Sequence, residues 1–290
     1  MLPPWLATTA GDYGSISRIR QALNRYGLYT VCEGARCPNI FRCWGEGTAT
    51  FMILGEVCTR SCRFCSVRTG DPRGLVDMGE AERLAKAVKE LGLRYVVVTS
   101  VARDDLPDGG ASAFAEAVRL LKGAGALVEV LVPDFGGSAE AVAAVVRSGP
   151  DVFAHNIETV RRLTPSVRDR RAGYDRSLAV LRAAKEFGAP LTKSGLMLGL
   201  GETFEEVVEA LDDLRRADVD IVTIGQYIRP TGSPRHIKPA RYVTPEEFEK
   251  LGDVARAMGF KAVASGPLVR SSYMAAELYR EALRNIVYIS

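Results

Sequence analysis

The sequence predicts an α/β fold in which six parallel strands alternate with six helices. From Thr48 onward, apolar runs rich in β-branched residues alternate with segments of helical periodicity. The 290 residues are enough for one α/β barrel or two smaller domains. No strong composition change marks a domain boundary after residue 48. Because such alternation gives right-handed crossovers, we expect an open, incomplete barrel or a flat doubly wound sheet.

The individual elements can be placed along the chain in order. Residues 1–47 form a loop-rich arm with one short helix expected at Ser15–Tyr26. The run TATFMILGE predicts a buried parallel strand at Thr48–Glu56. The later strands are expected at Tyr95–Val101, Leu127–Val132, Asp151–Ile157, Leu196–Leu200 and Ile221–Tyr227, and the helices at Glu80–Leu91, Ala111–Lys122, Ala139–Arg147, Arg176–Phe187 and from Thr203 and Thr244 onward.

The last two of these helices carry start signals. Thr203 followed by Glu206 has the T-x-x-E spacing of a capping box. Thr244 and Glu247 repeat that spacing, and Pro245 suits the first helical position. In either candidate fold, ligands bind at the carboxyl ends of the strands.

All six cysteines lie between Val31 and Val67, where they form two triplets of spacing C-x4-C-x5-C and C-x3-C-x2-C. The first triplet is Cys32, Cys37 and Cys43, and the second is Cys58, Cys62 and Cys65. Three thiolates bind three irons of a cubane [4Fe–4S] cluster and leave one iron open. Two triplets therefore predict two clusters.

Two other uses of clustered cysteines fit less well. Disulfides are typical of small secreted domains, whereas this chain is large and its N-terminus, MLPPWLATTAGDYG, has no basic and apolar leader. Structural zinc takes four ligands, and the two histidines, His155 and His236, are both distant in sequence. We therefore favour iron–sulfur ligation, and we expect both histidines to be structural.

The bulk properties narrow the function further. The net charge of +3 is too small to indicate nucleic acid binding. No run is long and apolar enough to span a membrane. We expect a cytoplasmic protein, in a compartment that keeps thiols available for iron.

The second triplet, CTRSCRFC at Cys58–Cys65, resembles the motif of the radical S-adenosylmethionine (SAM) superfamily. Its place directly after the first strand strengthens the resemblance. The resemblance implies that the open iron chelates SAM, which is cleaved reductively to a 5′-deoxyadenosyl radical. Phe64 resembles the residue beside the adenine, although it could equally be a packed core side chain.

Further segments resemble the lipoyl synthase family. They are CEGARCPNIFRCW before the second triplet, then TSVARDDLPDGG, HNIETV, TKSGLMLGLGE, GQYIRPT and GPLVRSSY, in order along nearly the whole chain. Ala102 and Met274 depart from the family, which usually has an acidic residue and often a histidine at these positions. Neither is an expected cluster ligand.

The resemblance implies a partial (β/α)6 radical-SAM-type barrel over 48–260, with an N-terminal cluster-binding arm over 1–47 and a C-terminal extension over 261–290. It implies two [4Fe–4S] clusters and SAM as cofactors, with the first triplet holding an auxiliary cluster. The family supplies the fourth ligand of that cluster from a serine that corresponds to Ser271. From the residues alone, Ser271 or Ser272 could instead cap the helix MAAELYREAL.

Other candidate ligand contacts lie at the strand ends. Thr99 and Ser100 could contact the methionyl part of SAM, and Asn156 and Glu158 could reach its ribose hydroxyls, or the latter two could simply hold a loop. Lys193 and Arg229 are candidates for carboxylate or substrate contacts.

The reaction implied by the resemblance is insertion of sulfur at C6 and C8 of an octanoyl chain on a lysine. Expected partners are octanoylated lipoyl carrier domains, namely acyltransferase subunits of 2-oxoacid dehydrogenases and the glycine cleavage H protein, a ferredoxin or flavodoxin, and an iron–sulfur carrier. We expect a monomer. Two alternatives stay open: another two-cluster radical SAM sulfur-inserting enzyme, such as a methylthiotransferase, and a two-cluster electron carrier without catalysis.

Overall fold

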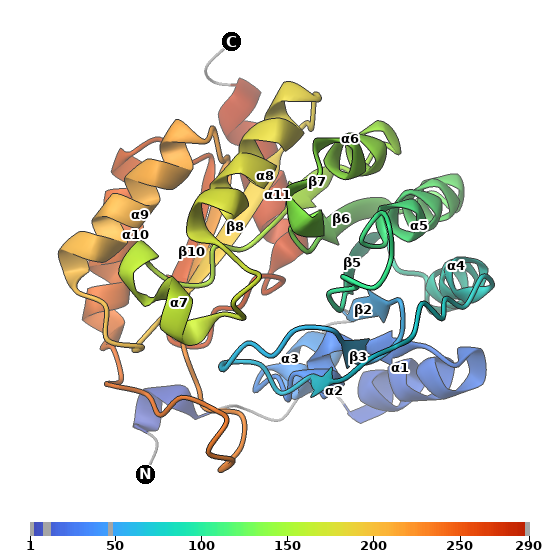
Figure 1. Ribbon diagram of the computed structural model, residues 1–290, viewed down its shortest axis with the longest axis horizontal. Coiled ribbons are helices and arrows are strands. Elements are labelled where there is room, and N and C mark those ends of the chain that lie inside the picture. The colour runs from blue at the N-terminus through green and yellow to red at the C-terminus, as the bar shows by residue number, and fades with distance from the viewer. Residues whose placement is uncertain (1–2, 8–12, 46–48, 288–290) are drawn as a thin grey trace.

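An eight-stranded sheet forms the centre of the computed structural model, which describes residues 3–7, 13–45 and 49–287 (Figure 1). The strand order is β1-β2-β5-β6-β7-β8-β9-β10. Only the first pair is antiparallel. The strands are β1 Tyr29–Thr30, β2 Thr50–Ile53, β5 Tyr95–Ser100, β6 Leu127–Leu131, β7 Val152–Ala154, β8 Thr192–Leu198, β9 Ile221–Gln226 and β10 Ala262–Gly266.

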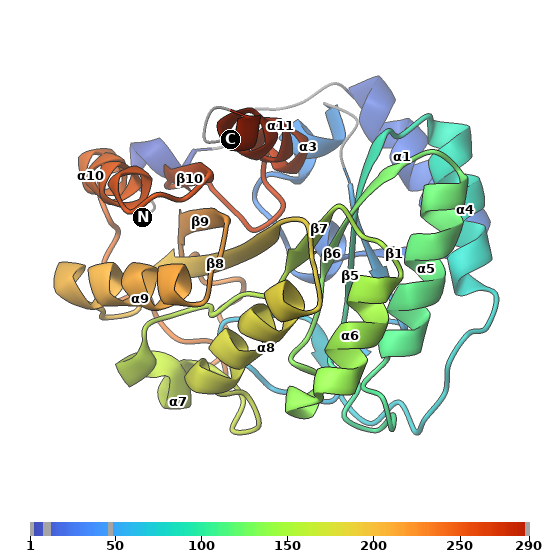
Figure 2. The ribbon, with the colours of Figure 1, turned by 90° about the horizontal axis from the view of Figure 1, so that it is seen from above.

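From β2 to β10 the parallel strands lie side by side in chain order, without the reversal that defines a doubly wound sheet. Right-handed crossovers that always advance in one direction place their helices on one face of the sheet. Figures 1 and 2 show these helices outside the curved sheet, where α4 packs on α5, α5 on α6 and α6 on α8. The predicted incomplete barrel is confirmed, and the doubly wound alternative is wrong.

The helices outside the sheet are α4 Glu80–Leu91, α5 Ala111–Gly123, α6 Ala139–Arg147, α8 Tyr174–Glu186, α9 Phe204–Arg216 and α10 Pro245–Ala257. The N-terminal arm contributes η1 Pro4–Leu6, α1 Tyr13–Tyr26, α2 Val31–Gly34 and α3 Ile40–Gly45, and the C-terminus contributes α11 Ala275–Val287. Short turns complete the set as η2 Phe135–Gly137, η3 Arg161–Leu163 and α7 Thr164–Val167. A separate two-stranded parallel pair is formed by β3 Val57–Cys58 and β4 Arg68–Thr69.

Several predicted boundaries need correction. The first predicted strand is too long, because Leu54 and Gly55 have φ of 68° and 79° and end β2 at Ile53. Its predicted start at Thr48, like the predicted boundary between 47 and 48, lies outside the described residues. The strand predicted at 196–200 instead begins at Thr192. The sequence prediction also missed β1 and β10, which are too short or too rich in small residues to give a periodic signal.

The two predicted helix starts differ in detail. Thr203 and Glu206 form the complete capping box before α9. Thr244 accepts a hydrogen bond from the backbone N–H of Glu247, as predicted. The Glu247 carboxylate, however, accepts two hydrogen bonds from the Arg241 guanidinium, at 2.7 Å each, so a bidentate ion pair occupies it.

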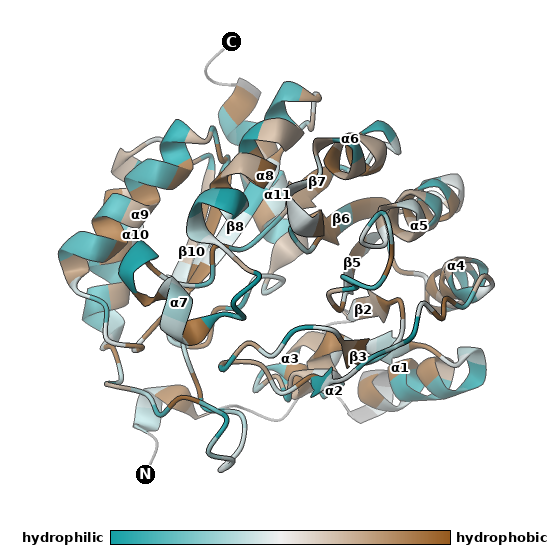
Figure 3. Cartoon of the chain, in the orientation of Figure 1, coloured by the Kyte–Doolittle hydropathy of each residue, from teal (hydrophilic) through white to brown (hydrophobic). Residues whose placement is uncertain are grey.

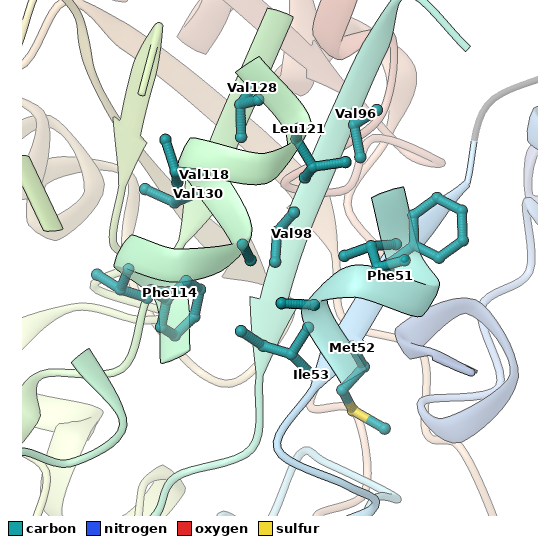
Figure 4. Packing of buried hydrophobic residues seen from close by; sticks show 14 of the residues in the cluster. Phe51, Met52, Ile53, Val96, Val98, Phe114, Val118, Leu121, Val128 and Val130 are labelled. Atoms are coloured by element: carbon teal, nitrogen blue, oxygen red, sulfur yellow. The ribbon is translucent and has the colours of Figure 1, made fainter. Parts of the chain in front are cut away.

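The sheet and its outer helices bury a continuous apolar core. Figure 4 shows part of it, in which Phe51 and Ile53 of β2, Val98 of β5, and Phe114 and Leu121 of α5 belong to one cluster. Figure 3 shows the outer helices striped with hydrophilic and hydrophobic residues, whereas β2 and β6 are largely hydrophobic. This pattern is expected of parallel strands that are covered by helices.

The C-terminal segment joins the same sheet. β10 pairs with β9 along its whole length, and α11 packs against β10. At Gly225 of β9, an added Cβ would lie 2.0 Å from the carbonyl oxygen of Val269. The segment after β10 can therefore approach the strand ends only because this residue is glycine.

Candidate active site

A cavity of about 520 Å³ lies at the carboxyl ends of the parallel strands. Residues that follow β2, β5, β6 and β7 line it, together with the N-terminal arm and the segment after β10. The structure brings all twelve predicted site residues to this one cavity: Cys32, Cys37, Cys43, Cys58, Cys62, Phe64, Cys65, Thr99, Ser100, Asn156, Glu158 and Ser271.

The second triplet begins at the end of β3, with Cys58, and continues on the loop between β3 and β4, with Cys62 and Cys65. The backbone N–H of Arg60 donates a hydrogen bond to Cys58 Sγ at 3.4 Å, and that of Asp169 donates to Cys62 Sγ at 3.3 Å. Burial raises the pKa of the Cys65 thiol to about 12. N–H groups aimed at sulfur are the outer contacts that stabilise cluster-bound thiolates.

The distances between candidate ligand side chains distinguish a site for a single metal ion from a site for an iron–sulfur cluster. Within the described ranges, no three His, Cys, Asp or Glu side chains converge closely enough to hold one metal ion. A single zinc ion needs sulfur atoms about 2.3 Å away on all sides, whereas a cubane distributes three cysteines over three irons. Cys58, Cys62 and Cys65 line one cavity, and three thiolates are the donor set that such a [4Fe–4S] cluster takes.

Arg60 fixes the loop between Cys58 and Cys62. Its side chain is 7% exposed, and Nη1 and Nη2 donate to the two carboxylate oxygens of Asp134 at 2.9 and 2.6 Å. Nε and Nη2 also donate to Asp104. Burial alone would raise the pKa of Asp134, but hydrogen bonds from Arg60 outweigh it and hold that pKa below its usual value.

The first triplet lies on the short helices of the arm. Thr30 caps α2, which carries Cys32, and the Cys37 backbone N–H donates to the carbonyl oxygen of Cys32 at 2.9 Å. Cys43 lies on α3. Burial raises the pKa of the Cys32 thiol to about 11. Smaller effects, including that of the nearby Trp44 indole, act to lower this pKa. That indole N–H is buried without an acceptor in hydrogen-bond geometry among the described residues.

Three hydrogen bonds join the C-terminal segment to this region. Asn39 Nδ2 donates to the carbonyl oxygen of Leu268 at 2.5 Å, and Thr50 Oγ1 donates to Ser272 Oγ at 2.8 Å. Asn156 Nδ2 donates to Ser271 Oγ at 2.6 Å. The residue directly before α11 is Met274, so neither serine occupies the N-cap position that the alternative interpretation required.

The remaining predicted contacts line the strand ends. Thr99 Oγ1 donates to the carbonyl oxygen of Leu131, and Ser100 Oγ donates to that of Val101, both at 2.8 Å. Their lone pairs stay available to a ligand. Burial raises the pKa of Glu158, although the buried Arg168 guanidinium opposes that shift. Phe64 packs partly against the core of the C-terminal half.

Two weaker candidates have different outcomes. Lys193 lies one residue after the start of β8, buried in an ion pair with Glu129 at 2.8 Å, and it does not line the cavity. Its expected position was wrong, because Lys193 lies at the amino end of β8 and the cavity lies at the carboxyl ends of the strands. Arg229 does line the cavity, and its guanidinium donates to backbone carbonyls of the following loop, including that of Ser233 at 2.6 Å.

Both histidines have structural contacts. His155 is bonded to the Val132 carbonyl oxygen at 2.8 Å and to Ser177 Oγ at 2.9 Å. Burial lowers the pKa of His155 to about 4, so it is neutral at pH 7. His236 Nε2 lies 3.0 Å from the carbonyl oxygen of Cys65 and so supports the second triplet's loop.

Sequence reasoning missed several charged residues of the cavity. Arg60, Arg168, Arg235 and Arg270 all line it. Arg235 donates to the carbonyl oxygen of Cys65 at 2.7 Å. Arg60 stands inside the second triplet and Arg270 directly precedes Ser271, which could have drawn attention to both, whereas nothing in the local sequence of Arg168 or Arg235 indicates a site.

Comparison with known proteins gives a consistent result. The family model of the radical SAM superfamily matches residues 52–214, more than half of the chain. A lipoyl synthase of Pyrobaculum aerophilum is 76% identical over 289 residues and covers 100% of both chains. A lipoyl synthase of Thermus thermophilus is 53% identical and covers 97% of this chain and 87% of that protein.

Solved structures support the fold. Methylornithine synthase (PylB) has a TM-score of 0.58 at 16% identity, covering 97% of this chain and 78% of that one. The FeFe-hydrogenase maturase HydG from Carboxydothermus hydrogenoformans has a TM-score of 0.59 at 15% identity, covering 93% and 68%. In the part of the chain that the structure describes, no helix has the length and apolar composition to cross a membrane.

Proposed function

The chain belongs to the lipoyl synthase family of radical SAM sulfurtransferases, and from this premise we propose that it inserts two sulfur atoms, at C6 and C8, into an octanoyl chain on a lysine. One observation carries the proposal: both cysteine triplets line a single cavity. A cavity shared by two cluster sites lets a radical formed beside one be trapped by sulfur from the other.

The chemistry explains why two sites are needed. An unactivated methylene or methyl carbon has neither an acidic proton nor a leaving group, so acid–base and nucleophilic catalysis have nothing to act on. When bound, a [4Fe–4S] cluster and SAM supply the electron and the radical that removes hydrogen from such carbons. The protein's task is to orient these groups and to exclude water.

We assign the cluster ligands from the cavity lining. Cys58, Cys62 and Cys65 would hold the cluster that binds SAM, with backbone N–H groups already directed at two of their sulfur atoms. The first triplet would hold a second [4Fe–4S] cluster that donates sulfur and is consumed. Ser271 is the proposed fourth ligand, because the C-terminal segment carries it to the same cavity. A hard serine oxygen matches iron less well than a thiolate, which suits a cluster that must open.

The contacts to SAM follow the strand ends. Phe64 would lie beside the adenine, and the hydroxyls of Thr99 and Ser100 would meet the methionyl group. Asn156 and Glu158 would bind the ribose hydroxyls. The proposed partners are octanoylated lipoyl carrier domains, a ferredoxin or flavodoxin as electron donor, and an iron–sulfur carrier that rebuilds the consumed cluster. We place this monomeric enzyme in the cytoplasm.

The test is mass analysis of an octanoylated lysyl peptide after anaerobic incubation with the reconstituted protein, SAM and reductant. The expected product gains two sulfur atoms, because two C–H bonds are replaced by two C–S bonds. It keeps both hydrogens as the dithiol under reducing conditions and loses them when the disulfide forms. The protein should contain about eight irons and eight sulfides, as two cubanes require. Transfer of a methylthio group would identify a methylthiotransferase, and two clusters without SAM cleavage would identify an electron carrier.

A further inference from the structure

The side-chain amide of Asn156 is hydrogen-bonded to residues of both proposed sites in the cavity, the SAM site and the auxiliary-cluster site. Asn156, two residues after β7, is 9% exposed. Its Nδ2 donates to Ser271 Oγ at 2.6 Å and to Glu158 Oε1 at 3.2 Å. Glu158 belongs to the proposed SAM site, and Ser271, 115 residues after Asn156, belongs to the proposed auxiliary site.

The orientation of this amide follows from its neighbours. An amide oxygen facing the carboxylate of Glu158 would be repelled, so Nδ2 must face it. Glu158 has φ of 68°, a left-handed conformation uncommon for a residue with a side chain, and so the backbone turn itself brings its carboxylate back toward Asn156. Both hydrogens of the amide are therefore committed, one to each site.

The amide oxygen is free to accept a further hydrogen bond. Asn156 Oδ1 is buried and has no hydrogen-bond partner in the described part of the chain. Leaving a buried acceptor unsatisfied is unfavourable, so it marks a place where a ligand donor is favoured. It also lies beside Gly195, where an added Cβ would come within 3.1 Å of it.

We infer that Asn156 is a positioning residue that couples SAM binding to the auxiliary site through Ser271. A SAM ribose hydroxyl that donates to Oδ1 fixes the amide, and the fixed amide directs Nδ2 at Ser271 Oγ. This hydrogen bond stabilises negative charge on the serine oxygen and so favours the state in which it binds iron. By linkage, an intact Ser271 in turn favours SAM binding. The inference rests on the proposed function.

The experiment is a double-mutant cycle on SAM affinity in the protein carrying both clusters. Ser271→Ala is expected to weaken SAM binding by about fivefold or more, the lower end of ordinary coupling between sites, although Ser271 does not contact SAM. In an Asn156→Ala background, Ser271→Ala should have no further effect. Ser272→Ala is the matched control, because that neighbouring hydroxyl is bonded to Thr50 instead, and it should leave SAM affinity unchanged.

A spectroscopic measurement separates coupling from a general structural effect. Adding SAM should change the Mössbauer signal of the auxiliary cluster's unique iron in the parent protein but not in Asn156→Ala. Additive effects of the two substitutions, or unchanged SAM affinity in Ser271→Ala, would overturn the coupling. If the parent protein itself bound no SAM or held only one cluster, the proposed function would fail first, and so the two failures can be told apart.

Discussion

The ion pair of Arg60 offers the most direct test of how the second triplet's loop is held. Replacing Arg60 with Leu leaves a shorter apolar side chain and removes every N–H that binds Asp104 and Asp134. Asp134 is fully buried and would lose both of its close guanidinium contacts. Removing one partner of a buried ion pair leaves an uncompensated charge, which is why such changes are strongly destabilising.

The expected cost can be worked out from the contacts. Breaking a buried pair typically costs about 3–5 kcal/mol. Two features place this case at the lower end: Asp104 is 24% exposed, and Arg176 stays 3.8 Å from Asp134. We expect Arg60→Leu to lower the free energy of unfolding by about 3 kcal/mol, roughly a hundredfold in the unfolding equilibrium.

The assay is anaerobic denaturant unfolding at several pH values, with Arg256→Leu as control. Arg256 forms an exposed pair with Asp253, a kind of contact that contributes only about 0–1 kcal/mol. In the parent protein the depressed pKa of Asp134 stabilises the fold above the unfolded value of about 3.9, and this contribution fades as pH falls through the folded pKa. In Arg60→Leu, burial without the guanidinium would raise that pKa, so protonation should relieve the cost.

The difference in the free energy of unfolding between the parent protein and Arg60→Leu should therefore be largest near pH 7 and shrink toward pH 4. If Arg60→Leu lowered the free energy of unfolding no more than Arg256→Leu does, this explanation of how the loop is held would be refuted. If the stability lost in Arg60→Leu were the same at pH 4 as at pH 7, the loss would come from packing and not from the buried charge of Asp134.

Three further predictions concern the cavity and one helix. Cys58→Ala should abolish reductive SAM cleavage, whereas Cys37→Ala should leave cleavage but stop sulfur transfer; lipoyl formation by Cys37→Ala would disprove the donor role. Ser271→Ala, at saturating SAM, should still cleave SAM but lose sulfur insertion, and full product formation would restore a purely structural role. Thr203→Ala removes the capping box of α9 and should lower the free energy of unfolding by about 0.5–2 kcal/mol in the same denaturant assay, against no change if water replaces the cap.

Local sequence signals predicted the repeating units of the fold well. The predicted bounds of α4 and α6 agree with the structure residue for residue, because each helix has a clear apolar stripe and a distinct end. The spacing of the cysteines and the motifs at the strand ends likewise pointed to side chains that the structure collects in one cavity.

Long-range pairing could not be predicted in the same way. The partners of Arg60 lie 44 and 74 residues away, and no periodic pattern links an arginine to two distant aspartates. β10 has the sequence AVASG, whose small residues carry little strand propensity, and it is a strand because β9 offers a parallel edge. The start of β8 was missed for a related reason: the polar residues TKS begin the strand although they do not belong to its apolar run.

The hydrogen bond from Asn39 to the Leu268 carbonyl oxygen has a consequence for biosynthesis. The two residues are 229 positions apart, so at ordinary synthesis rates of about 5–20 residues per second the arm waits roughly 11–46 s for its partner. During that time the first three cysteines are on a ribosome-bound chain that lacks one wall of their cavity. Under the proposed assignment of a second cluster to this site, the factor that loads it must therefore act on a finished chain, or protect an unfinished one until its last strand is made.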